Sequence, residues 1–261
     1  MQSSDKNNFD LSSLKVGFIL PAFNEYENIF ILLKQIESIF NNKSIIIIDD
    51  STNDSIKNKI SSRKDIIYIK RETKLGRGSA VLHGLKKLLE NKEIDFFVEI
   101  DTDLSEHPNQ LPEMIKFFLD NKIDLLVASR YLKGSEIINW SLRRRMFSFL
   151  ANKLAKFLLK VPVSDYTNGF RIYSNKAASH VVNSCGKIGS GFIVLSETLV
   201  ELYINNFKIQ DIKTKMVNRV TGKSSVNLRL VFDSLFGLIK LYINNREKIK
   251  FAHKANLIKQ K

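Results

Sequence analysis

Asp101 and Asp103 are two carboxylates separated by one residue, and they follow an apolar run over residues 96–100. The run predicts a buried strand, so both side chains lie in the turn after it and can point at one place. Mg²⁺ and Mn²⁺ prefer oxygen ligands, and substrate phosphates often complete their coordination. We therefore expect a metal-bound phosphate here. The alternative is that Asp103 or Ser105 only caps the helix that follows.

A second acidic pair, Asp49 and Asp50, ends another apolar run. Adjacent carboxylates at a strand end cost free energy unless a donor meets one of them, and a nucleobase imide or a ribose hydroxyl is such a donor. The alternative is a turn that caps a helix beginning at Asp54. Glu25 follows the first apolar run and is either a charge at a helix N-terminus or a nucleotide contact.

Arg77 is flanked by Gly76 and Gly78 at the start of a predicted helix. Glycine permits a close backbone approach, and the amides of a helix N-terminus attract phosphates. The segment matches neither a dinucleotide-binding fingerprint nor a P-loop.

The elements that position these residues alternate in type along the first half of the chain. We expect strands at residues 16–20, 44–49, 66–70, 96–100 and 125–129, and helices at 27–40, 54–62, 78–90 and 110–121. The strands are continuous apolar runs, which indicates that helices cover both faces of the sheet. The alternation predicts an α/β fold with a mainly parallel central sheet, whose ligands bind at the carboxyl ends of the strands.

The composition excludes several classes of protein. The chain has 261 residues, 44% of them hydrophobic and 26% charged, which suits a sizeable core. The single cysteine, Cys185, excludes an intrachain disulfide framework and a thiolate zinc site. No apolar run approaches the roughly 18 residues of a membrane span, so we expect a cytosolic protein unless it lies on a membrane surface.

The net charge of +14 is concentrated in two segments. Residues 130–160 hold eight basic residues and one acidic residue. Residues 213–261 hold twelve basic residues and two acidic residues. Within them, residues 142–161 and 228–249 place apolar side chains at helical spacing among lysines and arginines, as interfacial helices do. The alternatives are packing on the domain for both segments and on a second subunit for the tail. We expect a disordered N-terminus over residues 1–13, one domain over 14–225 and a basic helical tail over 226–261.

Several motifs together resemble a family 2 glycosyltransferase with the GT-A fold. In chain order they are PAFNE at 21–25, IDDSTNDS at 48–55, DTDLSEHP at 101–108, ASRY at 128–131, Arg144 with Ser148, DYTNGFR at 165–171, Gly191 and Phe192 with Glu197, and Arg219 with Gly222 and Ser224. Their order resembles the dolichyl-phosphate mannosyltransferases and their bacterial polyprenyl-phosphate relatives, over residues 14–228.

The resemblance implies roles for matching residues. Asp101 and Asp103 would hold Mg²⁺ or Mn²⁺ on the donor diphosphate, and Arg219 would meet that diphosphate from a closing loop. The donor-binding set also includes Pro21, Ala22, Glu25, Asp50 and Arg77. Arg130, Arg144 and Ser148 would hold a lipid phosphate. Two positions depart from the family pattern: Ser105 stands where Gln is frequent, and the closing loop reads Gly222-Lys223-Ser224-Ser225 instead of Gly-x-Ser-Lys.

These observations predict an inverting transferase that moves a hexose, mannose by default, from GDP-mannose or a UDP-sugar to a polyprenyl phosphate. An acceptor phosphate is already anionic and needs arginines more than a base. The alternative is a glycan or other hydroxyl acceptor, which needs a carboxylate base, and Asp165 and Glu197 are the candidates. A non-catalytic basic module is a third hypothesis. We expect a cytoplasmic protein that binds the cytoplasmic face of a membrane. A membrane-anchored subunit is another expected partner, and nucleic acid is not.

Overall fold

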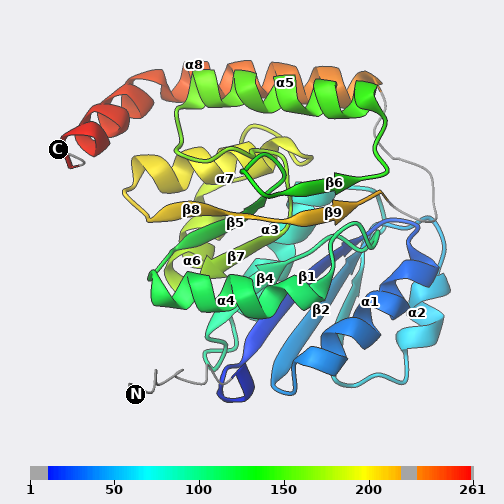
Figure 1. Cartoon of the computed structure of the whole chain (residues 1–261). Coiled ribbons are helices and arrows are strands. Elements are labelled where there is room, and N and C mark those ends of the chain that lie inside the picture. The colour runs from blue at the N-terminus through cyan, green and yellow to red at the C-terminus, as the bar shows by residue number, and fades with distance from the viewer. Residues whose placement is uncertain (1–10, 219–227, 260–261) are drawn as a thin grey trace, which may run out of the picture.

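A computed structural model describes residues 11–218 and 228–259 of the chain. Its central sheet has the strand order β3-β2-β1-β4-β7-β5-β8 (Figure 1). The strands of this sheet are β1 (Val16–Ala22), β2 (Lys43–Asp49), β3 (Ile66–Lys70), β4 (Phe96–Glu99), β5 (Leu125–Ser129), β7 (Arg171–Ser174) and β8 (Ile209–Lys213). A separate two-stranded ribbon pairs β6 (Glu136–Ile138) with β9 (Lys215–Val217).

The sheet is mainly parallel, as the sequence predicts. Strands β1, β2, β3 and β4 pair in parallel, and so do β5 and β8. Strand β7 is antiparallel to both β4 and β5, between which it lies. All five expected strands are present with bounds within two residues, whereas β6, β7, β8 and β9 were not expected. These four are three to five residues long and lack the continuous apolar run by which the other strands were predicted.

Helices cover both faces of the sheet. Their bounds are α1 (Tyr26–Ile39), α2 (Ser55–Ile60), α3 (Arg77–Leu88), α4 (Leu111–Asp120), α5 (Leu142–Leu159), α6 (Asn175–Ser184), α7 (Ile193–Ile204) and α8 (Leu228–Lys259), with short 3-10 turns at Leu11–Ser13 and Pro108–Gln110. Ile45 and Ile47 of β2 point into one core with α1, α2 and α4. Ile46 and Ile48 point into the other, with α3, α5, α6, α7 and α8. The unbroken isoleucine run is therefore buried on both sides.

The expected boundaries need two corrections. Residues 11–13, expected to be disordered, form a 3-10 turn, because Leu11 packs on the core. Helix α5 ends at Leu159 and not at Val161, since Lys160 is left-handed with φ 56° and the next residue precedes Pro162, which disfavours helix.

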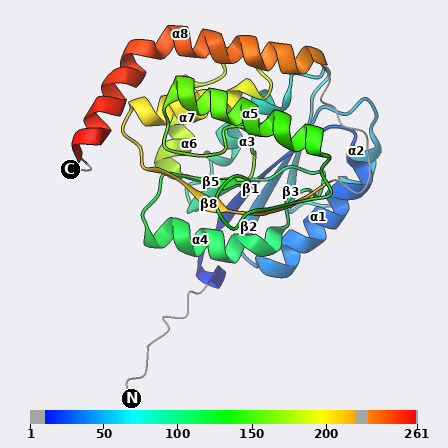
Figure 2. The ribbon, with the colours of Figure 1, turned by 45° about the horizontal axis from the view of Figure 1, so that its top comes forward.

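Helix α8 packs on the domain over part of its surface. Leu238, Leu241 and Ile249 are buried in the core shared with α7. Figures 1 and 2 show α8 on the same side of the sheet as α5, which it contacts. No helix within residues 11–218 and 228–259 is both long and apolar enough to cross a membrane.

Candidate active site

The turns after β1, β2 and β4 are joined by hydrogen bonds at one edge of the sheet. The backbone N–H of Asp50 donates to the carbonyl oxygen of Ala22 at 2.9 Å. The hydroxyl of Thr102 donates to the carbonyl oxygen of Pro21 at 3.0 Å. The parallel pairing of these strands thus gathers residues from three expected donor-binding motifs. Glu25 lies at the start of α1, where it accepts a hydrogen bond from Asn28 at 2.6 Å.

The acidic pair at the end of β2 is compensated by basic residues at the end of the neighbouring strand β3 and directly after it. Asp49 is fully buried and accepts from the hydroxyl of Tyr68 at 2.7 Å, with Lys70 Nζ at 3.3 Å. Both carboxylate oxygens of Asp50 accept from the guanidinium of Arg71. The expectation that these carboxylates need donors is correct, but the donors are side chains of the protein. Sequence reasoning missed Arg71, although it directly follows a predicted strand.

Arg77 lies between carboxylates. Its Nη1 is 2.5 Å from Glu99 Oε1, and its Nε donates to Asp101 Oδ1 at 2.7 Å. Glu99 is fully buried and also accepts from the hydroxyl of Tyr173 at 2.5 Å. Arg77 is therefore at the expected edge of the sheet, where it neutralises the acidic group that includes one predicted metal ligand.

The glycines beside Arg77 do allow a close backbone approach, but the partner is the protein. A Cβ added to Gly78 would lie 2.4 Å from the carbonyl oxygen of Gly191, and one added to Gly76 would lie 2.8 Å from that of Ser190. The N–H of Ser79 donates to the same Ser190 oxygen at 2.8 Å. The glycines pack the start of α3 against the turn before α7, and that packing accounts for them without a phosphate.

Carboxyl groups are concentrated after β4. Asp103 Oδ1 accepts a hydrogen bond from the N–H of Ser105 at 3.0 Å. Glu106 is fully buried, and its Oε1 has no hydrogen-bond partner in the part of the chain that the structure describes. Burial first, and then the charges of Asp101 and Asp103, raise the pKa of Glu106 to about 8. This excess of carboxylates fits a hard divalent cation.

The described residues offer only part of such a coordination sphere. Among residues 11–218 and 228–259, no three His, Cys, Asp or Glu side chains are grouped as metal ligands. Asp101 and Asp103 would therefore bind the ion together with oxygens of the substrate and water, as Mg²⁺ sites commonly do.

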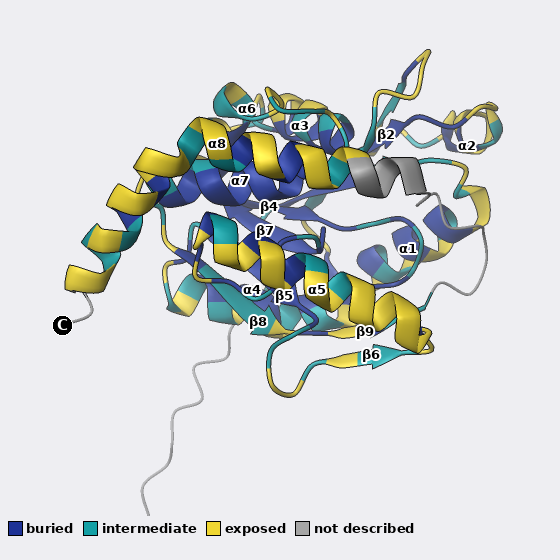
Figure 3. Ribbon diagram, turned by 90° about the horizontal axis from the view of Figure 1, so that it is seen from above, coloured by how far each residue is buried: buried dark blue, intermediate teal, exposed yellow. Residues whose placement is uncertain are grey.

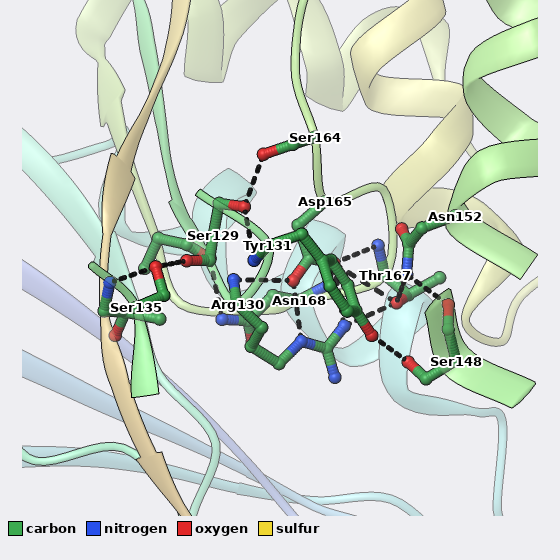
Figure 4. Close-up of polar contacts among 12 residues, drawn as sticks. Ser129, Arg130, Tyr131, Ser135, Ser148, Asn152, Ser164, Asp165, Thr167 and Asn168 are labelled. Carbon is green, nitrogen blue, oxygen red and sulfur yellow. Dashed lines mark hydrogen bonds and ion pairs between the residues drawn. The ribbon is translucent and has the colours of Figure 1, made fainter. Parts of the chain in front are cut away.

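A second polar cluster lies after β5, around Arg130 (Figure 4). Arg130 is 9% exposed, and its Nε and Nη2 donate to the two carboxylate oxygens of Asp165 at 2.6 and 2.7 Å. Nη2 also donates to Thr167 Oγ1 at 2.6 Å. Burial opposes the charge of Asp165, but the charge and hydrogen bonds of Arg130 prevail and lower the pKa of Asp165.

Helix α5 contributes Ser148 and Asn152 to the same cluster. The hydroxyls of Tyr131 and Ser148 lie 2.6 Å apart. Asn152 Nδ2 donates to the carbonyl oxygen of Ser148 at 2.9 Å and to Thr167 Oγ1 at 3.2 Å. These contacts tie α5 to the end of β5 and to the loop that carries Asp165.

Arg144 reaches the cluster through Trp140. Its guanidinium lies 3.8 Å from the centre of the Trp140 ring, and that of Arg130 lies 5.4 Å from the same ring. Arg144 Nη1 donates to Asn218 Oδ1 at 2.8 Å. The structure thus brings Arg130, Arg144 and Ser148 into one neighbourhood, as the resemblance implies. Sequence reasoning missed Trp140. The feature that could have drawn attention to it is that the only tryptophan of the chain stands just before a basic helix.

Residues 18–182 match the sequence family described as Glycosyl transferase family 2. The chain belongs to this family. It is 26% identical over 228 residues to the undecaprenyl-phosphate mannosyltransferase of Micrococcus luteus, covering 82% of this chain and 93% of that protein. It is 28% identical over 235 residues to the dolichol-phosphate mannosyltransferase of Pyrococcus furiosus, covering 87% of this chain and 64% of that longer protein.

Solved structures with the same fold are more distant in sequence. Glucosyl-3-phosphoglycerate synthase of Mycobacterium tuberculosis, solved with Mn²⁺, UDP-glucose and phosphoglyceric acid, is 18% identical, with a TM-score of 0.63 over 88% of this chain and 80% of that one. Another structure of that synthase has a TM-score of 0.61 and 20% identity, covering 87% and 80%. The GT-A-like fold expected from the motifs is therefore confirmed.

The two carboxylates considered as a base in this glycosyltransferase both have structural partners. Asp165 is bound to Arg130. Glu197 is 2% exposed and accepts from the backbone N–H groups of Gly186 and Lys187 at 2.8 and 3.1 Å. Arg219 and the loop over residues 222–225 lie outside the described residues, so their predicted contacts stay predictions.

We expect Glu106→Gln to reduce the pH dependence of stability in the metal-free glycosyltransferase. The pKa of Glu106 is about 8 in the folded protein and ordinarily 4.5, so its neutral form stabilises the fold. That stabilisation is complete below about pH 4.5 and is lost as the pH rises through about 8. In EDTA, the Tm of the wild type should fall between pH 6 and pH 9, and that of the variant should fall by at least a few degrees less.

The matched control is Glu72→Gln, which alters an exposed carboxylate outside the cluster. It should keep the slope of the wild type. Equal slopes for all three proteins would show that Glu106 is ionised in the folded state across this range.

Proposed function

We propose that this glycosyltransferase moves mannose from a nucleotide diphosphate sugar to a polyprenyl phosphate. The observation that carries the proposal is the convergence of Arg130 and Arg144 on one aromatic ring, with Ser148 joined to the same cluster. Guanidinium groups match phosphate oxygens, and a lipid phosphate is the acceptor that needs two of them. The names of the two mannosyltransferase relatives support this acceptor and this sugar.

The engagement of both candidate bases favours a phosphate acceptor over a hydroxyl acceptor. A hydroxyl must lose its proton during transfer, whereas a phosphate monoester attacks as an anion. Asp165 has a lowered pKa and both its oxygens on Arg130, and Glu197 caps a turn. The chemistry left to the protein is to hold the acceptor oxygen in line with the sugar carbon.

On the donor side, Asp101 and Asp103 would hold Mg²⁺ or Mn²⁺. The ion, when bound, stabilises negative charge on the leaving diphosphate. The acidic surroundings of Glu106 fit this cation, and Arg77 keeps Asp101 oriented at the site. The relatives' names give mannose as the sugar, so the proposed donor is GDP-mannose, with a UDP-sugar as the alternative. The loop that carries Arg219 would contact the diphosphate of this donor.

The acceptor is a lipid, and one face of the protein is suited to a membrane surface. Helices α5 and α8 lie side by side there and expose many residues (Figure 3). Large apolar side chains are exposed among them, including Leu142 at 82%, Phe157 at 76%, Phe236 at 74% and Ile243 at 60%. Lysines and arginines of the same helices would attract anionic lipids. We propose that this face binds the cytoplasmic leaflet; a membrane-anchored partner covering it is the alternative.

Asp103→Ala should abolish metal-dependent transfer and leave the fold intact. The carboxylate lies in a turn beyond the core, so its loss removes a metal ligand and little packing. We expect turnover to fall by about a hundredfold or more and Mn²⁺ binding, measured by titration calorimetry with GDP, to weaken in parallel. Asp120→Ala, an exposed carboxylate on α4, is the control. Near-normal Mn²⁺ binding by Asp103→Ala would remove the metal assignment.

Arg144→Ala should raise the KM for a short polyprenyl phosphate by about tenfold to a hundredfold. This is the effect expected when a hydrogen bond to a charged group is lost. The KM for the nucleotide sugar should stay within twofold. Arg144→Lys should recover only part of the loss, because one point charge replaces a planar fork. Arg143→Ala removes the exposed neighbour on the same helix and should change neither KM. Equal, small, salt-screened effects at both positions would favour a hydroxyl acceptor.

Phe236→Ser should weaken binding to vesicles of phosphatidylglycerol and phosphatidylcholine by about tenfold or more. This loss corresponds to the free energy of burying one phenylalanine side chain. Ile31→Ser is the matched control, because Ile31 is 47% exposed on α1, away from α5 and α8. Cosedimentation measures both. If the two variants bind vesicles as the wild type does, the face does not dock on lipid and a partner subunit becomes its proposed occupant.

A further inference from the structure

Trp140 occupies an unusual place in the cluster after β5. It precedes Ser141, the N-cap of α5, whose hydroxyl accepts from the N–H of Arg144 at 3.3 Å. Its side chain is nearly buried, at 8% exposed. The guanidinium groups of Arg144 and Arg130 lie over its ring at 3.8 and 5.4 Å from the centre. Two guanidinium groups therefore lie close to one tryptophan ring.

The ring helps to position both guanidinium groups, because an aromatic face attracts cations. Asp165 binds Arg130, and Asn218 Oδ1 accepts a hydrogen bond from Arg144 at 2.8 Å. Trp140 therefore lies where two side chains suited to phosphate oxygens come together.

The indole N–H of Trp140 has no acceptor within residues 11–218 and 228–259. Among the described residues, two buried side-chain nitrogens lack a hydrogen-bond partner, Nε1 of Trp140 and Nε2 of His180. A buried donor without a partner costs free energy, so native proteins rarely leave one unless a ligand or water completes it. In the same cluster, Nη1 of Arg130 makes no hydrogen bond within the described chain, because Asp165 and Thr167 take Nε and Nη2.

We propose that Trp140 is a binding and positioning residue for the acceptor phosphate. Its N–H donates to a phosphate oxygen, and its ring holds Arg144 in place for the same anion. This inference rests on the proposed function. It adds Trp140 to the acceptor site through two contributions that can be tested separately, the indole N–H and the ring. A tryptophan that serves only the core would contribute through its size, and its effect on donor and acceptor would be equal.

Trp140 also provides a direct readout, because it is the only tryptophan of the chain. Its fluorescence in the wild type should change saturably when farnesyl phosphate is added. Farnesol, which lacks the phosphate, should produce no such change, and inorganic phosphate should produce the same change only at much higher concentration. In Arg144→Ala the response to farnesyl phosphate should shift to at least tenfold higher concentration. This measurement requires no change at Trp140.

Two substitutions separate the N–H from the ring. Trp140→Phe keeps an aromatic face for Arg144 and removes the donor, so the acceptor KM should rise by about three- to tenfold, the loss of one hydrogen bond. Trp140→Leu removes both, and the acceptor KM should rise further, approaching that of Arg144→Ala. In both variants the nucleotide-sugar KM should stay within twofold. Melting temperatures of the variants identify any general loss of folding.

The outcomes distinguish this inference from the proposed function. If Arg144→Ala impairs acceptor binding and Trp140→Phe does not, and the wild-type fluorescence is unresponsive, Trp140 has no part in the site while the lipid-phosphate acceptor stands. If Trp140→Phe raises donor and acceptor KM equally, its role is structural and the inference is wrong. If Arg144→Ala and Trp140→Phe both leave acceptor binding unchanged, the acceptor site itself is refuted.

Discussion

Charged side chains buried at the carboxyl ends of the strands must each meet an opposite charge, and the functional edge of the sheet is organised by that requirement. Removing an ion from water costs several kcal/mol unless it is paired and hydrogen-bonded. Three arginines from different segments of the chain provide the pairing. The pairs are Arg71 with Asp50, Arg77 with Glu99 and Asp101, and Arg130 with Asp165. Each pair joins segments distant in the chain, so neutralising the charge also fixes the loops of the site.

This requirement explains why structural and functional roles coincide. A guanidinium bound in the plane of a carboxylate by two nitrogens is held rigidly, and its third nitrogen then points in a defined direction. Arg130 illustrates the arrangement, since Asp165 holds Nε and Nη2 and leaves Nη1 available. Asp165 is accordingly a positioning residue in this protein. A carboxylate so engaged is a poor proton acceptor, which agrees with an acceptor that arrives already ionised.

Helix α5 links the acceptor cluster to the outer surface. Asn152, Ala155 and Leu159 are buried, and Ser148 and Asn152 bond into the cluster. Phe157 and Leu142 on the same helix are exposed. A lipid whose chain lies in the membrane beside α5 would have its phosphate within reach of the other side of one helix. The proposed membrane face and the proposed acceptor site therefore depend on the orientation of a single element.

The sequence by itself determined the α/β class, five strands, the helices between them and the acidic residues at strand ends, because apolar periodicity and strand-end polarity are local properties. It could not determine which charges meet. Lys70 faces Asp49 through the β2–β3 register, and Arg71 reaches Asp50 one residue later. The close backbone approach expected at the glycines beside Arg77 is present, but its partners, Ser190 and Gly191, are more than a hundred residues away and could not be identified from the sequence. Trp140 likewise gains meaning only from the two arginines over its ring, which register and packing bring together from separate elements.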